Sequence, residues 1–133
     1  MDLNGKTALV TGGSRGIGGA ISRALAAHGV NVAVNYFKHQ EPAQAMVKEI
    51  EDKGCKAMAV QADISSAPDI ERMISEVEET LAPVDILVNN AGYIEGGQLL
   101  DVSEEQWDRM MNVGTKGPFL CTKAVAPSMI ARE

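Results

Sequence analysis

A glycine-rich turn directly after a short apolar run is the feature that most constrains the fold of this chain. The run KTALV at residues 6–10 is bounded by turn-forming residues and is typical of a strand. The stretch TGGSRGIGGA follows at residues 11–20, although a glycine in the first turn of a helix costs about 1 kcal/mol relative to alanine. We therefore expect another group to approach the backbone closely at this turn.

Strand and helix patterns alternate along the whole chain. Short β-rich or apolar runs predict strands, and apolar residues spaced three and four apart predict helices. Ser66 and Ser103 stand where N-caps are expected, and Gln106 completes a capping box with Ser103. The predicted strands cover residues 6–10, 31–37, 56–63 and 84–92, and the predicted helices cover 17–28, 42–53, 66–81, 103–111 and about 116 to the end.

This alternation predicts an α/β fold. Strands that are apolar on both faces indicate a parallel sheet covered by helices, and right-handed crossovers leave few topologies. The leading one is the doubly wound parallel sheet with helices on both faces, of the Rossmann type. Residues 1–133 are then a single dinucleotide-binding domain, with its ligand beyond the carboxyl ends of the strands.

Composition excludes several classes of partner. The net charge is -6 and Lys and Arg form no block, so neither nucleic acid nor an anionic membrane surface is expected as a partner. No apolar run approaches the roughly 20 residues that span a bilayer, and the N-terminus resembles no secretory signal. Cys55 and Cys121 lie far apart and predict reduced, buried thiols. We expect a cytoplasmic protein without a metal site.

The glycine turn predicts a phosphate site. Unpaired N–H groups and the positive end of the helix dipole lie at a helix N-terminus and favour an anion. Gly12, Gly16 and Gly18 follow a G-x-x-x-G-x-G spacing, which differs from the G-x-G-x-x-G fingerprint and from a P-loop. The alternative is a glycine-rich turn without a ligand.

Together, TGGSRGIG at 11–18 and NNAG at 89–92 closely resemble motifs of the short-chain dehydrogenase/reductase family. Within it the chain is most similar to the 3-oxoacyl-[acyl-carrier-protein] reductases and related sugar and alcohol dehydrogenases. The resemblance covers the chain from Lys6 to about Met129. The extended, epimerase-type branch has a tighter glycine spacing and fits less well.

The resemblance implies a role for each matching residue. Asp63 would accept a hydrogen bond from the adenine amino group, and Ile64 would pack beside the ring. Asn112 would hold a water in the proton relay, with a helix kink or cap as its alternative role. The pyrophosphate and adenosine phosphate would be surrounded by Gly12, Ser14, Arg15, Gly16, Ile17 and Gly18, and the adenosine ribose would be lined by Asn90, Ala91 and Gly92.

The end of the second strand indicates which cofactor is bound. A carboxylate at this point binds the ribose 2′-hydroxyl of NAD(H) and repels a 2′-phosphate. Tyr36 stands in that position, and no acidic residue follows before Glu41. Arg15 and Lys38 could hold the phosphate dianion, so the sequence predicts NADP(H) over NAD(H). The alternative is that Lys38 is a solvated loop residue.

The chain departs from the family at the catalytic pair. The family places a proton-donating tyrosine four residues before a lysine, with a serine beside the carbonyl. Here Tyr36 is followed four positions later by Gln40, and Tyr93 by Gly97. Relative to the family, these 133 residues would be the N-terminal portion only, without the catalytic half.

Two functions fit this departure. The chain would supply the cofactor-binding half of an oxidoreductase that reduces a carbonyl, such as a 3-oxoacyl thioester or similar ketone, or oxidises the alcohol. Alternatively, it is a non-catalytic nucleotide-binding or interaction module. By itself the chain is predicted to be inactive in either case.

An open sheet edge and uncovered side chains predict a homo-oligomer. The fourth strand would expose a free edge, which favours pairing with another chain. The last helix would leave four apolar side chains without cover, namely Phe119, Leu120, Val125 and Met129.

Overall fold

Four β-rich segments pair as one parallel sheet in the order β3-β2-β1-β4. The computed structural model of the chain describes residues 2–132. Ala8 in β1 lies opposite Val32 on one side and Ile86 on the other, so the strand order reverses beside β1. The strands are β1 (Thr7–Val10), β2 (Asn31–Tyr36), β3 (Ala57–Gln61) and β4 (Ile86–Val88).

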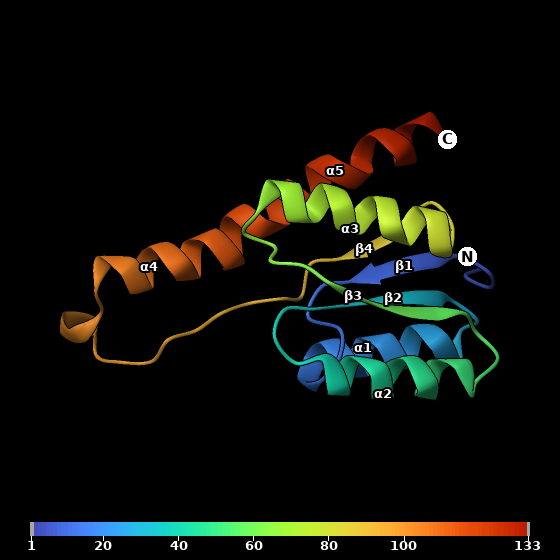
Figure 1. Ribbon diagram of the computed structural model, residues 1–133, viewed down its shortest axis with the longest axis horizontal. Coiled ribbons are helices and arrows are strands. Elements are labelled where there is room, and N and C mark those ends of the chain that lie inside the picture. The colour runs from blue at the N-terminus through green and yellow to red at the C-terminus, as the bar shows by residue number, and fades with distance from the viewer. Residues whose placement is uncertain (1, 133) are drawn as a thin grey trace.

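Helices cover both faces of this sheet (Figure 1). The helices α1 (Gly16–Ala27) and α2 (Gln40–Glu51) lie on one face, and α3 (Ala67–Thr80) and α5 (Gly117–Ala131) lie on the other. Alternate residues of β1 point to opposite faces of the sheet. Val10 packs in the core between the sheet and α1 and α2, and Leu9 packs in the core between the sheet and α3 and α5. The predicted doubly wound α/β fold is confirmed.

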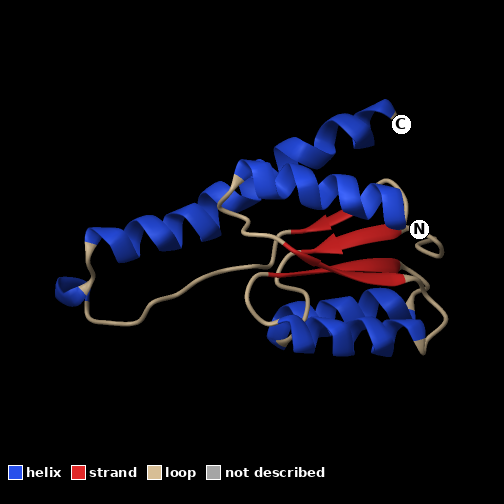
Figure 2. Cartoon of the chain, viewed as in Figure 1, coloured by secondary structure: helices blue, strands red, loops and turns tan. Residues whose placement is uncertain are grey.

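A longer connection follows β4. The loop after β4 and the helix α4 (Glu104–Met111) extend away from the sheet (Figure 2), with a short 3-10 turn, η1 (Leu99–Asp101), between them. The predicted capping box is present, because Gln106 N–H donates to Ser103 Oγ at 3.1 Å and Ser103 N–H donates to Gln106 Oε1 at 2.8 Å.

A π-helical turn, η2 (Asn112–Lys116), joins α4 to α5, and the sequence patterns did not predict it. Pro118 follows at the start of α5 and has no N–H to donate to the carbonyl of Gly114. The Gly117 N–H instead donates to the carbonyl of Asn112, five residues earlier. The wider turn therefore accommodates the proline without breaking the helical path.

Most predicted segments differ from the structure by one or two residues at an end, and two of the differences have a clear local reason. The predicted strand 84–92 contains β4 only as far as Val88, because the chain turns there and the Asn90 N–H donates to the Val88 carbonyl and to Thr11 Oγ1. The predicted helix 42–53 runs instead from Gln40 to Glu51. Pro42 lies in its first turn, where an N–H has no partner within the helix to lose.

The expectation of four uncovered side chains on α5 is wrong for Val125. Val125 is 2% exposed and packs with Cys121 in the core between α3 and α5. Leu120 and Met129 are partly buried against the same core, and Phe119 is 60% exposed. The helix α3 provides cover that the sequence pattern had not assigned.

The start of α1 lies almost in contact with the loop after β1. A Cβ added to Gly18 would collide with the carbonyl oxygen of Gly12 and the side-chain amide of Asn90. Both neighbours are themselves hydrogen-bonded, since Asn90 Nδ2 donates to the Gly12 oxygen at 3.1 Å. The close approach that we expected at the glycine turn is therefore found at Gly18, where helix α1 lies against the loop after β1.

We expect Gly18→Ala to destabilise the fold by about 2 kcal/mol, because overpacking outweighs the gain of about 1 kcal/mol in helix propensity. Urea unfolding followed by circular dichroism measures this change. Gly114→Ala is the control, because an added Cβ there meets nothing within 4 Å. Equal stability of Gly18→Ala and the parent chain would contradict the packing argument.

An ion pair connects the end of α5 to the residue before β4. Arg132 Nη1 donates to Asp85 Oδ1 at 2.8 Å, and its Nη2 donates to the Val84 carbonyl at 2.7 Å. The other oxygen of Asp85 accepts from the Thr7 N–H at 3.0 Å. Burial alone would raise the pKa of Asp85, but these hydrogen bonds and nearby Lys6 hold it below its ordinary value of 3.8.

We expect Asp85→Asn to lower the free energy of unfolding by about 1 kcal/mol at pH 7. A depressed folded-state pKa stabilises the protein above the unfolded pKa, and this contribution is lost as the pH falls through the folded value. The difference between the two proteins should therefore shrink below about pH 4. Urea titrations at pH 7 and pH 3 measure it, with Asp52→Asn as the control in an exposed pair. A difference independent of pH would contradict this assignment.

Candidate functional site

A cleft of about 930 Å³ opens over the carboxyl ends of the strands. Loops after all four strands line it, and Arg109 and Val113 close one side from α4 and η2. Its position matches the expectation for an open parallel sheet, where ligands bind beside the reversal of strand order. The structure brings ten predicted site residues together there, namely Gly12, Ser14, Arg15, Tyr36, Lys38, Asp63, Ile64, Asn90, Ala91 and Gly92.

Four of the predicted site residues, all within the described residues 2–132, do not line the cleft. Gly18 is buried against the loop after β1, as described above. Gly16 has φ +57 and open space where a Cβ would stand, and the Ile17 side chain is 77% exposed. Asn112 is the C-cap of α4 and begins the π-helical turn η2.

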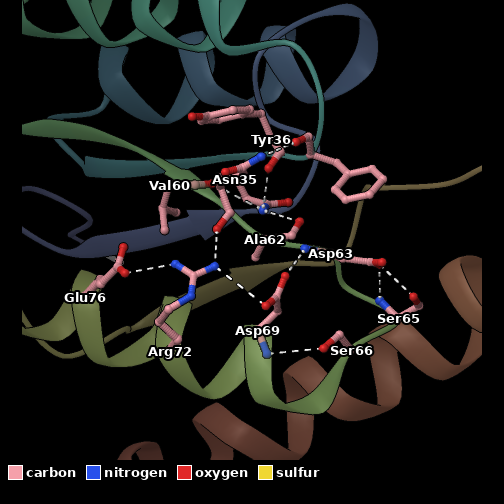
Figure 3. Close-up of polar contacts among 12 residues, drawn as sticks. Asn35, Tyr36, Val60, Ala62, Asp63, Ser65, Ser66, Asp69, Arg72 and Glu76 are labelled. Carbon is pink, nitrogen blue, oxygen red and sulfur yellow. Dashed lines mark hydrogen bonds and ion pairs between the residues drawn. The ribbon is translucent and has the colours of Figure 1, made fainter.

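Asn35 organises the floor of the cleft. Its side chain is almost fully buried at 2% exposure. Its Oδ1 accepts from the Gly12 N–H at 3.2 Å, and its Nδ2 donates to the carbonyls of Val60 and Ala62, both at 3.3 Å. Figure 3 shows this side chain between β2 and the end of β3. Asn35 thus ties the glycine turn to two neighbouring strands.

The bonds of Asn35 also limit what the glycine turn can offer a ligand. The Gly12 N–H is used by Asn35 Oδ1, and the Gly13 N–H donates to the Asn35 carbonyl at 3.1 Å. Two amides of the turn therefore already have partners within the fold. The N-terminus of α1, among the described residues, has no side-chain cap and no acidic residue in its first turn, so the amides there remain the available donors.

Thr11 and Asn90 form a second connection beneath the cleft. Thr11 is 1% exposed, and its hydroxyl accepts from the N–H groups of Asn90 and Ala91, both at 3.0 Å. Asn90 Nδ2 donates back to the carbonyls of Thr11 and Gly12. These hydrogen bonds hold the NNAG segment, residues 89–92, against the glycine turn.

Sequence reasoning missed Asn35 and Thr11. The available signal was a polar residue inside an apolar strand, in NVAVNY, and another at the end of ALVT. A buried amide or hydroxyl must find hydrogen-bond partners. Such residues therefore indicate contacts to neighbouring loops as well as strand structure.

The lining of the cleft carries more positive than negative side chains. Arg15, Lys38 and Arg109 line it, whereas Asp63 is the single carboxylate among the described lining residues. Lys38 Nζ lies 5.6 Å from the centre of the Phe37 ring, which is itself half exposed. Lys38 is exposed and lines the cleft, and this balance of charge favours an anionic ligand.

Asp63 and Ile64 diverge after β3. Asp63 Oδ1 accepts from the Ser65 hydroxyl at 2.6 Å, at the cleft wall. The Ile64 side chain is 6% exposed and packs in the core against Gly117. Of the two, Asp63 is the one that presents polar chemistry at this wall.

A polar cluster not predicted from the sequence lines the far side of the cleft. The Tyr93 hydroxyl donates to Glu95 Oε2 at 2.8 Å and accepts from Arg109 Nη1 at 3.2 Å. The Tyr93 hydroxyl, and then the Gln106 side chain, lower the pKa of Glu95. The cluster ties the loop after β4 to α4.

Neither a metal centre nor a membrane segment is found in the described part of the chain. No group of three His, Cys, Asp or Glu side chains within residues 2–132 is arranged to hold a metal ion. None of the helices in this range combines the length and apolarity needed to cross a bilayer.

Comparisons with known proteins agree with this geometry. Residues 6–133 match the family described as short chain dehydrogenase. The chain is 43% identical over 128 residues to the 3-oxoacyl-[acyl-carrier-protein] reductase FabG of Staphylococcus epidermidis, covering 96% of this chain and 52% of the relative. It is 41% identical over 131 residues to the 3-oxoacyl-[acyl-carrier-protein] reductase of Synechocystis, covering 98% and 53%.

Solved structures show the same likeness. A blue fluorescent protein from a metagenomic library, in complex with NADPH, has a TM-score of 0.90 and 43% identity, covering 97% of this chain and 53% of that one. A short chain dehydrogenase from Burkholderia cenocepacia, in complex with NADP, has a TM-score of 0.91 and 43% identity, covering 96% and 52%. The chain spans about half the length of the curated relatives it matches. By its match over residues 6–133, the chain belongs to the short-chain dehydrogenase family.

Proposed function

We propose that this chain is the cofactor-binding half of an NADP(H)-dependent oxidoreductase. The observation that carries the proposal is the pair of cations, Arg15 and Lys38, at a cleft whose β2 wall has no carboxylate. Residues 35–39 read NYFKH, so nothing acidic opposes a 2′-phosphate at this point. The two structural neighbours crystallised with NADPH and NADP support the same cofactor.

The residues of the glycine turn fit a dinucleotide phosphate. Gly16 has φ +57 and open space beside it, so backbone and ligand can approach there. The uncapped amides at the start of α1 and the helix dipole would hold the pyrophosphate. Because the Gly12 amide serves Asn35, Gly12 would act by shape, and Ser14 and Arg15 would add donors at the rim.

The remaining predicted residues would hold the adenosine and nicotinamide ends. Asp63 would face the adenine, beside the backbone of Ile64, and Tyr36 would line the ribose phosphate. Asn90, Ala91 and Gly92 would line the adenosine ribose as a backbone surface fixed by Thr11. Asn112 would support a proton relay from outside the cleft wall. The cofactor supplies the hydride, and this chain binds and orients it.

The substrate we propose is a 3-oxoacyl thioester or similar ketone, or the corresponding alcohol in the reverse direction. Two relatives named 3-oxoacyl-[acyl-carrier-protein] reductase support this class. Residues 1–133 would form one dinucleotide-binding domain, which we place in the cytoplasm. The β4 edge has no strand partner within residues 2–132 except β1, which supports assembly with another copy or a further segment.

A second candidate is a non-catalytic nucleotide-binding or interaction module. Neither tyrosine of the 133 residues precedes a lysine by four positions, which favours this reading. The mass of the natural protein, or the gene sequence past codon 133, distinguishes the two. A Tyr-x-x-x-Lys segment downstream would support the reductase, and a stop codon would support the module.

We expect the chain to bind NADPH about tenfold or more tightly than NADH, because one charge-assisted pair at the 2′-phosphate is worth about 1.5–3 kcal/mol. Isothermal titration calorimetry measures both affinities. Arg15→Ala should remove most of the preference. Lys56→Ala is the matched control, because Lys56 lies before the amino end of β3, whereas the cleft lies at the carboxyl ends of the strands. Tighter binding of NADH, unchanged in Arg15→Ala, would refute the assignment.

The chain by itself should not reduce a ketone, because the 133 residues hold no Tyr-x-x-x-Lys pair to protonate the carbonyl oxygen. Loss of NADPH absorbance with an acetoacetyl thioester measures this activity. The double variant Arg15→Ala/Lys38→Ala gives the background rate. Turnover by the parent chain above that background would show that another group supplies the proton.

A further inference from the structure

The backbone of Asp63 is fixed on both sides by the start of α3. Its N–H donates to Asp69 Oδ2 at 2.9 Å, and its carbonyl accepts from the Ser66 N–H at 3.0 Å. Figure 3 shows Asp63 where β3 gives way to α3. Both main-chain polar groups of Asp63 are therefore used to hold this turn.

The residues that hold Asp63 are themselves held. Ser66 is the N-cap of α3, and its Oγ accepts from the Asp69 N–H at 3.4 Å. One turn later, Arg72 Nη2 donates to the Gln61 carbonyl at 2.7 Å and lies 3.9 Å from Asp69 Oδ1. The turn between β3 and α3 thus has a defined conformation at both ends.

Ser65 fixes the side chain of Asp63. The Ser65 N–H donates to Asp63 Oδ1 at 2.9 Å, and the Ser65 hydroxyl donates to the same oxygen at 2.6 Å. In Figure 3 the Asp63 carboxylate is turned towards Ser65. Asp63 Oδ2 makes no hydrogen bond with any residue between 2 and 132 that the structure describes, and both residues line the cleft. One acceptor oxygen is therefore occupied and the other is available.

We propose that Ser65 is a positioning residue that sets the base preference of this site. By holding Asp63 Oδ1, it presents Oδ2 to the 6-amino group of adenine. An ionised carboxylate only accepts hydrogen bonds, and the adenine 6-amino group donates one, whereas a 6-oxo group is an acceptor. The Ser65–Asp63 pair consequently favours adenine over a 6-oxopurine. This inference rests on the proposed dinucleotide function.

The experiment compares NADPH with its deamino analogue, reduced nicotinamide hypoxanthine dinucleotide phosphate, by calorimetric titration. We expect the parent chain to bind the hypoxanthine form about tenfold or more weakly, since a site built to accept a hydrogen bond rejects a partner that lacks the donor. Ser65→Ala should reduce this ratio about three- to tenfold, the worth of one hydrogen bond. Ser65→Thr retains the hydroxyl and should retain the ratio.

A double-mutant comparison separates positioning from a direct contact. In an Asp63→Asn background, Ser65→Ala should leave the ratio unchanged, because the carboxylate through which Ser65 acts is gone. Ser75→Ala is the matched control, since the Ser75 hydroxyl also donates to a carboxylate, Glu79 Oε1 at 3.0 Å, on the surface of α3. It should alter neither the ratio nor the affinity. Thermal unfolding of each variant shows that the fold is retained.

The outcomes are distinct. If the parent chain binds neither nucleotide, the proposed function fails and this inference falls with it. If the parent chain binds NADPH but Ser65→Ala keeps the full ratio, the proposed function stands and Ser65 has no positioning role. An equal effect of Ser65→Ala with and without the Asp63 carboxylate would also overturn the inference.

Discussion

The contact between the Gly12 carbonyl and the first turn of α1 is the constraint on which the site depends. Gly18 lies against this oxygen where no side chain could fit, and Asn90 donates to it from the loop after β4. Helix, glycine turn and NNAG segment therefore meet at one backbone atom. That meeting point sets how near α1 comes to the sheet, and hence the position of its uncapped N-terminus at the cleft.

The cleft combines a rigid floor with a charged rim. Asn35 and Thr11 are both nearly fully buried, and their side chains form hydrogen bonds with the glycine turn and the segments beside it. Arg15, Lys38 and Arg109 line the cleft, where Asp63 is the single carboxylate among the described lining residues, and Arg109 is paired with Glu95 beside the cleft. The shape of the cleft thus comes from buried amides and hydroxyls, and the positive charge at its rim is the basis of the anionic cofactor site that we propose.

Much of the fold could be predicted from the sequence, because short apolar strands alternate with helices that carry local start signals such as Ser66 and Ser103. The family resemblance is confirmed by the match over residues 6–133. Contacts between distant segments could not be predicted. The cover of Val125 by α3 and the Tyr93–Arg109 contact each depend on tertiary packing, which periodicity along one segment does not encode. The π-helical turn has a local cause, Pro118, but helical periodicity does not distinguish a π-turn from a continuous α-helix.

The bonds beneath the cleft have a consequence for sequence divergence. Asn35 and Thr11 are bonded mainly to main-chain groups, including the Gly12 N–H, the carbonyls of Val60 and Ala62 and the N–H of Ala91. A main-chain partner is the same whatever side chain its residue carries. These bonds therefore place no requirement on the side chains of Val60, Ala62 and Ala91, whereas the network requires the amide of Asn35 and the hydroxyl of Thr11. Gly12 is constrained separately, by its φ of +60.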